Sequence, residues 1–97
     1  MKKYYLNYRF ALLFDDDEVC LTEGEEKLVT LSREDIGGFL FTSGIVCIRD
    51  KVIFFMSYDE FNDKIEIIID CNDEEFQIIV EAENIIEGLK NVYYQRR

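Results

Sequence analysis

Apolar and polar residues alternate with a period of two along most of this chain, which is typical of β-strands whose successive side chains point to opposite faces of a sheet. The clearest example runs from Tyr4 to Phe14, where an aromatic or aliphatic residue occupies every second position. We expect one long strand there. Shorter runs of the same kind predict strands at residues 19–22, 27–31, 39–42, 45–49, 51–57, 64–70 and 75–80.

One short segment in the first half has the features of a helix. Ser32 followed by Asp35 has the form of a capping box, in which the two side chains satisfy backbone N–H groups at a helix start. Gly37 and Gly38 follow closely, and glycine commonly ends a helix. We therefore predict a single helical turn in this region.

The end of the chain changes to helical spacing. Its apolar residues recur three or four positions apart, at Ile85, Ile86, Leu89, Val92 and Tyr93. Asn84 with Glu87 forms a weak capping pattern before them. We predict a terminal amphipathic helix, and Gly88 within it costs about 1 kcal/mol relative to alanine.

This order of elements predicts an α+β, β-rich fold in a single domain covering residues 1–97. The favoured form is a strongly bent antiparallel sheet or small barrel of about six to eight strands, capped by one C-terminal amphipathic helix. The alternative is a single antiparallel sheet with the helix packed on one face. The element order is similar to that of pleckstrin-homology domains, but no motif accompanies the likeness, which concerns order alone.

Two of the predicted strands are apolar on both faces, around residues 53–56 and 67–69. Such strands need a second layer to cover the face that does not meet the core. Closure of the sheet into a barrel would supply that layer, and so would a homodimer interface. Both alternatives follow equally from the pattern.

The charge is strongly negative and unevenly distributed. The chain has 21 acidic and 11 basic residues, a formal net charge of -10 at pH 7. All acidic residues lie between Asp15 and Glu87, whereas several basic residues lie close to the two ends of the chain. A charge of this sign repels phosphate backbones and anionic lipids, so we expect neither direct nucleic-acid binding nor membrane binding.

Many carboxylates fall in predicted loops, where they can meet a partner without disturbing the core. Acidic loops of this kind steer a basic partner and raise its association rate. The simpler interpretation is that these carboxylates only keep an apolar domain soluble. The candidate partner-binding residues are Asp15, Asp16, Asp17, Glu18, Glu23, Glu25, Glu26, Asp73, Glu74 and Glu75.

The residue inventory excludes most common catalytic sites. The chain has no histidine, which removes the usual nucleophile–histidine pairs and most zinc and iron sites. Its three cysteines, Cys20, Cys47 and Cys71, have no paired metal-ligand spacing, and their odd number argues against a disulfide framework. We expect buried free thiols in a reducing cytoplasm, and no enzyme activity, cofactor or metal.

These observations favour a non-enzymatic acidic binding protein. We expect an inhibitor or immunity-type protein that covers a basic, nucleic-acid-binding surface of a protein partner, for example a nuclease. A structural or scaffolding homo-oligomer is one alternative. A pleckstrin-like module that binds a ligand or peptide is another. The longest apolar runs are far shorter than the roughly 20 residues of a membrane-spanning helix.

Overall fold

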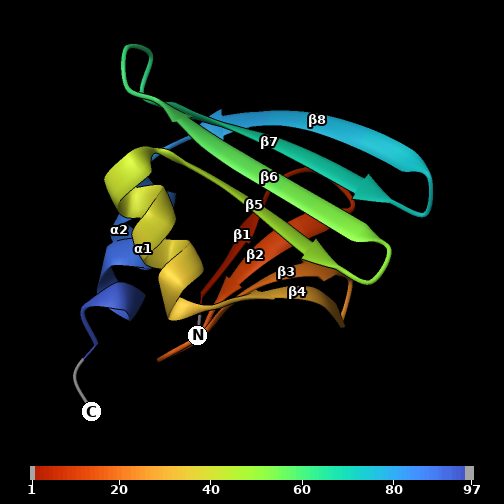
Figure 1. Ribbon diagram of the computed structural model, residues 1–97, viewed down its shortest axis with the longest axis horizontal. Coiled ribbons are helices and arrows are strands. Elements are labelled where there is room, and N and C mark those ends of the chain that lie inside the picture. The colour runs from red at the N-terminus through yellow and green to blue at the C-terminus, as the bar shows by residue number, and fades with distance from the viewer. Residues whose placement is uncertain (1, 96–97) are drawn as a thin grey trace.

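The computed structural model describes residues 2–95, which form two antiparallel four-stranded sheets and two helices (Figure 1). The first sheet has the order β1 (Lys2–Tyr5), β2 (Phe10–Phe14), β3 (Val19–Glu23) and β4 (Glu26–Leu31), and α1 (Arg33–Thr42) follows it. The second has the order β5 (Gly44–Arg49), β6 (Val52–Asp59), β7 (Lys64–Cys71) and β8 (Glu74–Glu81), and α2 (Glu83–Tyr93) follows it. Each half of the chain is thus a four-stranded meander followed by a helix.

The α+β class and the number of strands agree with the sequence prediction. The sheets do not close into a barrel, because each strand pairs only with its neighbours in the chain and the two sheets share no hydrogen-bonded strand pair. In this respect the fold is closer to the alternative of an open antiparallel sheet. It differs from both predictions in having two sheets and a second full helix.

The hydrophobic core lies between the inner faces of the sheets. In the second sheet, alternate residues of β6 and β7 point inward and are completely buried, among them Phe54, Met56, Ile65 and Ile67. The first sheet contributes Phe10, Leu12, Val19 and Leu21, which are also completely buried. The two helices lie side by side across one end of this core (Figure 1). Their buried residues are Ile36, Gly37, Phe39, Ile85 and Leu89.

The long first strand predicted over residues 4–14 is wrong, because the chain turns back on itself in the middle. The Asn7 side-chain oxygen accepts hydrogen bonds from the backbone N–H groups of Arg9 and Phe10, each at 2.8 Å. The N–H of Leu6 donates to the carbonyl of Phe10 at 2.8 Å. This local network replaces strand pairing with a turn, and β1 then pairs with β2.

The prediction of a strand at residues 39–42 is also wrong, because α1 continues through Gly37 and Gly38 to Thr42. The capping box at its start is confirmed, with reciprocal bonds of 3.0 Å between Ser32 and Asp35. The helix ends at Ser43, whose backbone adopts the left-handed conformation with φ of 68°.

Gly37 lies where the two helices meet. A Cβ at Gly37 would lie 2.8 Å from the Tyr93 ring, so the glycine serves this close contact and does not end the helix.

The terminal helix is confirmed, but its start differs from the prediction. The N-cap position is Ala82, which has no side-chain capping bond, and Asn84 lies inside the first turn. Burial explains this start, because Ala82 is fully buried and Ile85 and Leu89 point into the core. Within residues 2–95, neither helix is long and apolar enough to cross a membrane.

Candidate functional site

Six of the ten acidic residues expected to bind a partner are brought together at one end of the molecule. They lie in or beside the β3–β4 and β7–β8 turns, at the end that points away from the helices (Figure 1). We call this the hairpin end. The six residues are Glu23, Glu25, Glu26, Asp73, Glu74 and Glu75, and all except the half-buried Glu23 are exposed.

Arg9, in the β1–β2 turn, links the two sheets at the hairpin end. Its guanidinium forms an ion pair with Glu23 of the first sheet and lies 3.6 Å from Glu74 of the second. The guanidinium carbon is also 4.9 Å from the centre of the Phe76 ring. The hydrogen bond to Glu23 raises the pKa of Arg9 above its ordinary value, because it favours the charged guanidinium.

The remaining carboxylates of the hairpin end leave an excess of negative charge. The cleft between its turns, about 460 Å³ in volume, is itself balanced. Its charged lining consists of Glu23, Glu26, Asp50, Lys27, Arg49 and Lys51. Outside the cleft, the described chain shows no ion pair for Glu25, Asp73 or Glu75, and these side chains are exposed. The carboxylates in excess therefore lie on the outer rim of the hairpin end.

The other four predicted residues, Asp15, Asp16, Asp17 and Glu18, form the β2–β3 turn at the opposite end. The turn is closed by a 2.8 Å hydrogen bond from the Asp15 N–H to the Glu18 carbonyl. The Glu18 carboxylate lies 3.8 Å from the Lys27 ammonium. One strand separates this turn from the hairpin end, a distance of about 17 Å for five residues. The ten residues therefore do not form one continuous surface.

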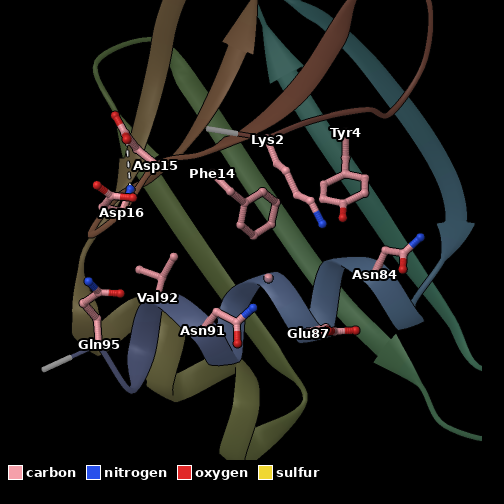
Figure 2. A pocket seen from close by; sticks show the side chains of 11 residues that line it. Lys2, Tyr4, Phe14, Asp15, Asp16, Asn84, Glu87, Asn91, Val92 and Gln95 are labelled. Atoms are coloured by element: carbon pink, nitrogen blue, oxygen red, sulfur yellow. Dashed lines mark hydrogen bonds between the residues drawn. The ribbon is translucent and has the colours of Figure 1, made fainter.

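A cleft of about 210 Å³ lies between this turn and α2 (Figure 2). Figure 2 shows Lys2, Tyr4 and Phe14 on one side and Asn84, Glu87 and Asn91 of α2 on the other. Its polar groups are mainly carboxylates and amides, a set that offers neither a paired nucleophile and base nor a metal cage. Among the described residues, no three acidic or cysteine side chains are grouped closely enough to hold a metal ion.

All three cysteines are free and buried, as the sequence predicts. Burial raises the pKa of the Cys47 thiol to about 11, and the nearby Asp35 carboxylate adds to the shift. Burial also raises the pKa of Cys20 and Cys71. Since the thiolate is the reactive form, none of the three is prepared to act as a nucleophile near neutral pH.

The outer face of the second sheet carries an apolar cluster that no other element of residues 2–95 covers. Val46 and Ile48 of β5 pair across the strands with Phe55 and Ile53 of β6, and Phe55 pairs with Ile68 of β7. Three of these side chains are well exposed, at 57% for Val46, 62% for Ile48 and 42% for Ile53. We call these five residues the outer apolar cluster.

Carboxylates border this cluster along one side. Outward positions of β7 and β8 include Glu66, Asp70, Glu75 and Glu81, which we call the carboxylate strip, and Ile68, Gln77 and the 67% exposed Ile79 lie between them. Ile53 is paired directly with Asp70, and Asp70 with Glu75. The neighbouring Lys64 forms an ion pair with Glu81. The outer face therefore combines an exposed apolar area centred on β5 and β6 with carboxylates that alternate with Ile68, Gln77 and Ile79 on β7 and β8.

The sequence indicated this surface only indirectly, through strands that are apolar on both faces. Periodicity identifies two faces but not which one the rest of the chain covers. Its location follows from the strand register and from the helices packing across one end of the core instead of on the outer face.

Comparison with models of protein families, with curated protein sequences and with solved structures finds no match to this chain.

Proposed function

We propose that the chain is a non-enzymatic binding protein that occupies a basic surface of a protein partner, in the manner of small acidic inhibitors and immunity-type proteins. The observation that carries the proposal is the gathering of exposed carboxylates from both sheets at the hairpin end, with Glu25, Asp73 and Glu75 outside any ion pair of the described chain. A surface of this charge complements one that binds nucleic acid, so a nuclease is a suitable partner.

The physical basis is long-range electrostatic attraction between the acidic chain and a basic partner. Once bound, the chain excludes nucleic acid from the basic surface that it covers. A net charge of -10 raises the association rate with a basic protein by roughly 10- to 1,000-fold at low salt. Carboxylates projected from turns held by Arg9 keep their positions on binding, which lowers the entropy cost of association. The raised pKa values of the buried thiols support a role without nucleophilic chemistry, and such thiols suit a reducing cytoplasm.

The first test identifies the partner and measures its affinity at two ionic strengths. Proteins captured from a lysate of the native host at about 50 mM and about 500 mM salt would be identified by mass spectrometry, and the purified candidate would then be titrated against the chain. We expect a basic protein whose affinity falls steeply with salt. A partner without basic surface, or affinity that does not change with salt, would contradict the proposal.

Matched charge variants locate the binding surface. The hairpin-end variant combines Glu25→Gln, Glu26→Gln, Asp73→Asn and Glu75→Gln. The control combines Asp15→Asn, Asp16→Asn, Glu83→Gln and Glu87→Gln, which changes the net charge by the same amount at the helix end. We expect the first to weaken binding about tenfold or more and the second less than about threefold. Equal losses would show that only total charge matters and would remove the hairpin end as the site.

A further inference from the structure

We propose that the outer face of the second sheet is a docking site for a basic amphipathic α-helix of the protein partner. This inference rests on the proposed function and adds the chemistry of the segment that is recognised. The exposed face of an antiparallel sheet is ordinarily polar, so Ile48 at 62% exposure beside Ile53 at 42% calls for an explanation. Contiguous exposed apolar surface with a polar border is typical of a protein-binding site.

The size of the outer apolar cluster suits one helix. It covers three neighbouring strands, which is about 10 Å across at the usual strand spacing, and two successive outward positions along each of β5 and β6. A helix is about 10 Å wide, and its apolar side chains form a stripe on one face. An exposed apolar face of a sheet is commonly covered by a helix that packs on it.

The carboxylate strip defines the charge of that helix. Glu66 and Asp70 lie four residues apart on β7, about 13 Å along the strand, which corresponds to about nine residues of a helix lying alongside. Lysine or arginine residues on one flank of the helix would therefore meet both carboxylates while the apolar stripe covers β5, β6 and the Ile68 side chain between Glu66 and Asp70. Lys64, which lies opposite Glu81 in the strand register, is already paired with that carboxylate.

The same charges disfavour a second copy of this chain as the occupant. In a two-fold dimer whose outer faces overlap completely, the carboxylate strip of one copy faces either the strip of the other copy or its outer apolar cluster. The first arrangement brings like charges together, and the second removes carboxylates from water without a partner. A basic helix avoids both costs.

The probe is a designed 18-residue helical peptide with a leucine stripe and lysines along one flank, and the control peptide has glutamates in place of those lysines. Backbone amide shifts of the isotope-labelled full chain locate the bound peptide, and calorimetry measures its affinity. We expect shifts over β5–β8 and at least tenfold weaker binding of the glutamate peptide. Shifts centred elsewhere, or equal affinities, would overturn the proposal, as would dimerisation of the free chain through β5–β8.

Two variants and one control test the residues. The double variant Ile48→Ser with Ile53→Ser should weaken the lysine peptide about tenfold, whereas Tyr8→Ser, on a side chain that is 92% exposed in the β1–β2 turn, should not change it. The double variant Glu66→Gln with Asp70→Asn should weaken binding several-fold at about 50 mM salt and little at about 500 mM. It leaves the apolar cluster intact, so it tests the proposal even if the serine variant unfolds. Unchanged binding in both double variants would refute the site.

The two proposals fail in different ways with the natural partner. Loss of binding in the hairpin-end variant together with full binding by both outer-face variants would overturn the docking site and leave the acidic binding function in place. Salt-insensitive binding by all variants would overturn both proposals.

Discussion

Replacing Gly88 by alanine in α2 has two opposing effects whose sizes decide the outcome. Alanine is favoured over glycine inside a helix by about 1 kcal/mol. The added Cβ, however, would lie 2.7 Å from Cε2 and 2.8 Å from Cδ2 of the Phe14 ring. That ring is only 5% exposed and packs edge-on against Tyr4, with 5.4 Å between ring centres, so moving it away from the new Cβ would disturb this contact.

The expected result is a net loss of stability. Overpacking of a buried contact costs about 1–3 kcal/mol, and subtracting the helix preference leaves a loss of about 1 kcal/mol. For a domain of this size, that lowers the midpoint of thermal unfolding by about 4–8 °C. Urea unfolding followed by circular dichroism measures the free energy directly. Asn91→Ala, at an exposed position of the same helix, is the control and should raise stability by a few tenths of a kcal/mol.

A double-mutant cycle isolates the contact. Phe14→Leu shortens the side chain that the new Cβ would meet, so Gly88→Ala should become neutral or stabilising in that background. If Gly88→Ala raises the stability of the unmodified chain by about 1 kcal/mol, helix preference alone is at work and the packing argument is refuted.

Three further predictions concern local structure. Ser32→Ala removes the acceptor of the Asp35 N–H and should cost about 1 kcal/mol in urea unfolding; no loss would show that the capping box is not stabilising. Asn7→Ala leaves two N–H groups without their acceptor and should cost about 1–3 kcal/mol, whereas Asn7→Asp should retain most of the stability. The pKa of Cys47 is about 11 against an ordinary 9.0, so the folded state holds more protons between these values, and stability should fall as the pH rises through that range. Cys47→Ala should flatten this fall, and an unchanged pH profile would contradict the assignment.

The second half of the chain could be predicted closely, because its apolar runs are rich in β-branched and aromatic residues, have the length of strands and are separated by polar turns. β7 and β8 extend only one residue beyond the ranges expected at one or both ends. The first half could be predicted less closely, because side-chain hydrogen bonds there override the alternation of apolar and polar residues. The hydrogen bonds of Asn7 interrupt the strand although the alternation continues through it, and Phe39 satisfies a strand pattern and a helical one equally well.

The candidate residues could be named from the sequence, but their grouping required the topology. Because the chain reverses at every hairpin, the turn containing Asp15 and the turn containing Glu25 must lie at opposite ends of β3. The outer apolar cluster could not be located at all, since the sequence does not say which face of a two-sided strand meets the core. That information lies in how the two sheets and the helices pack together.

The repetition of a four-stranded meander and a helix has a consequence for how the chain can be rearranged. Each hydrogen-bonded strand pair joins neighbours in sequence, so the loops that close these pairs are short and no strand pair joins the two sheets. Lys2 and Gln95 line the same cleft, which places the two ends of the described chain close together. A circular permutant that starts at Gly44, ends at Ser43 and joins the present ends by a glycine–serine linker would therefore retain every strand pair in its native register.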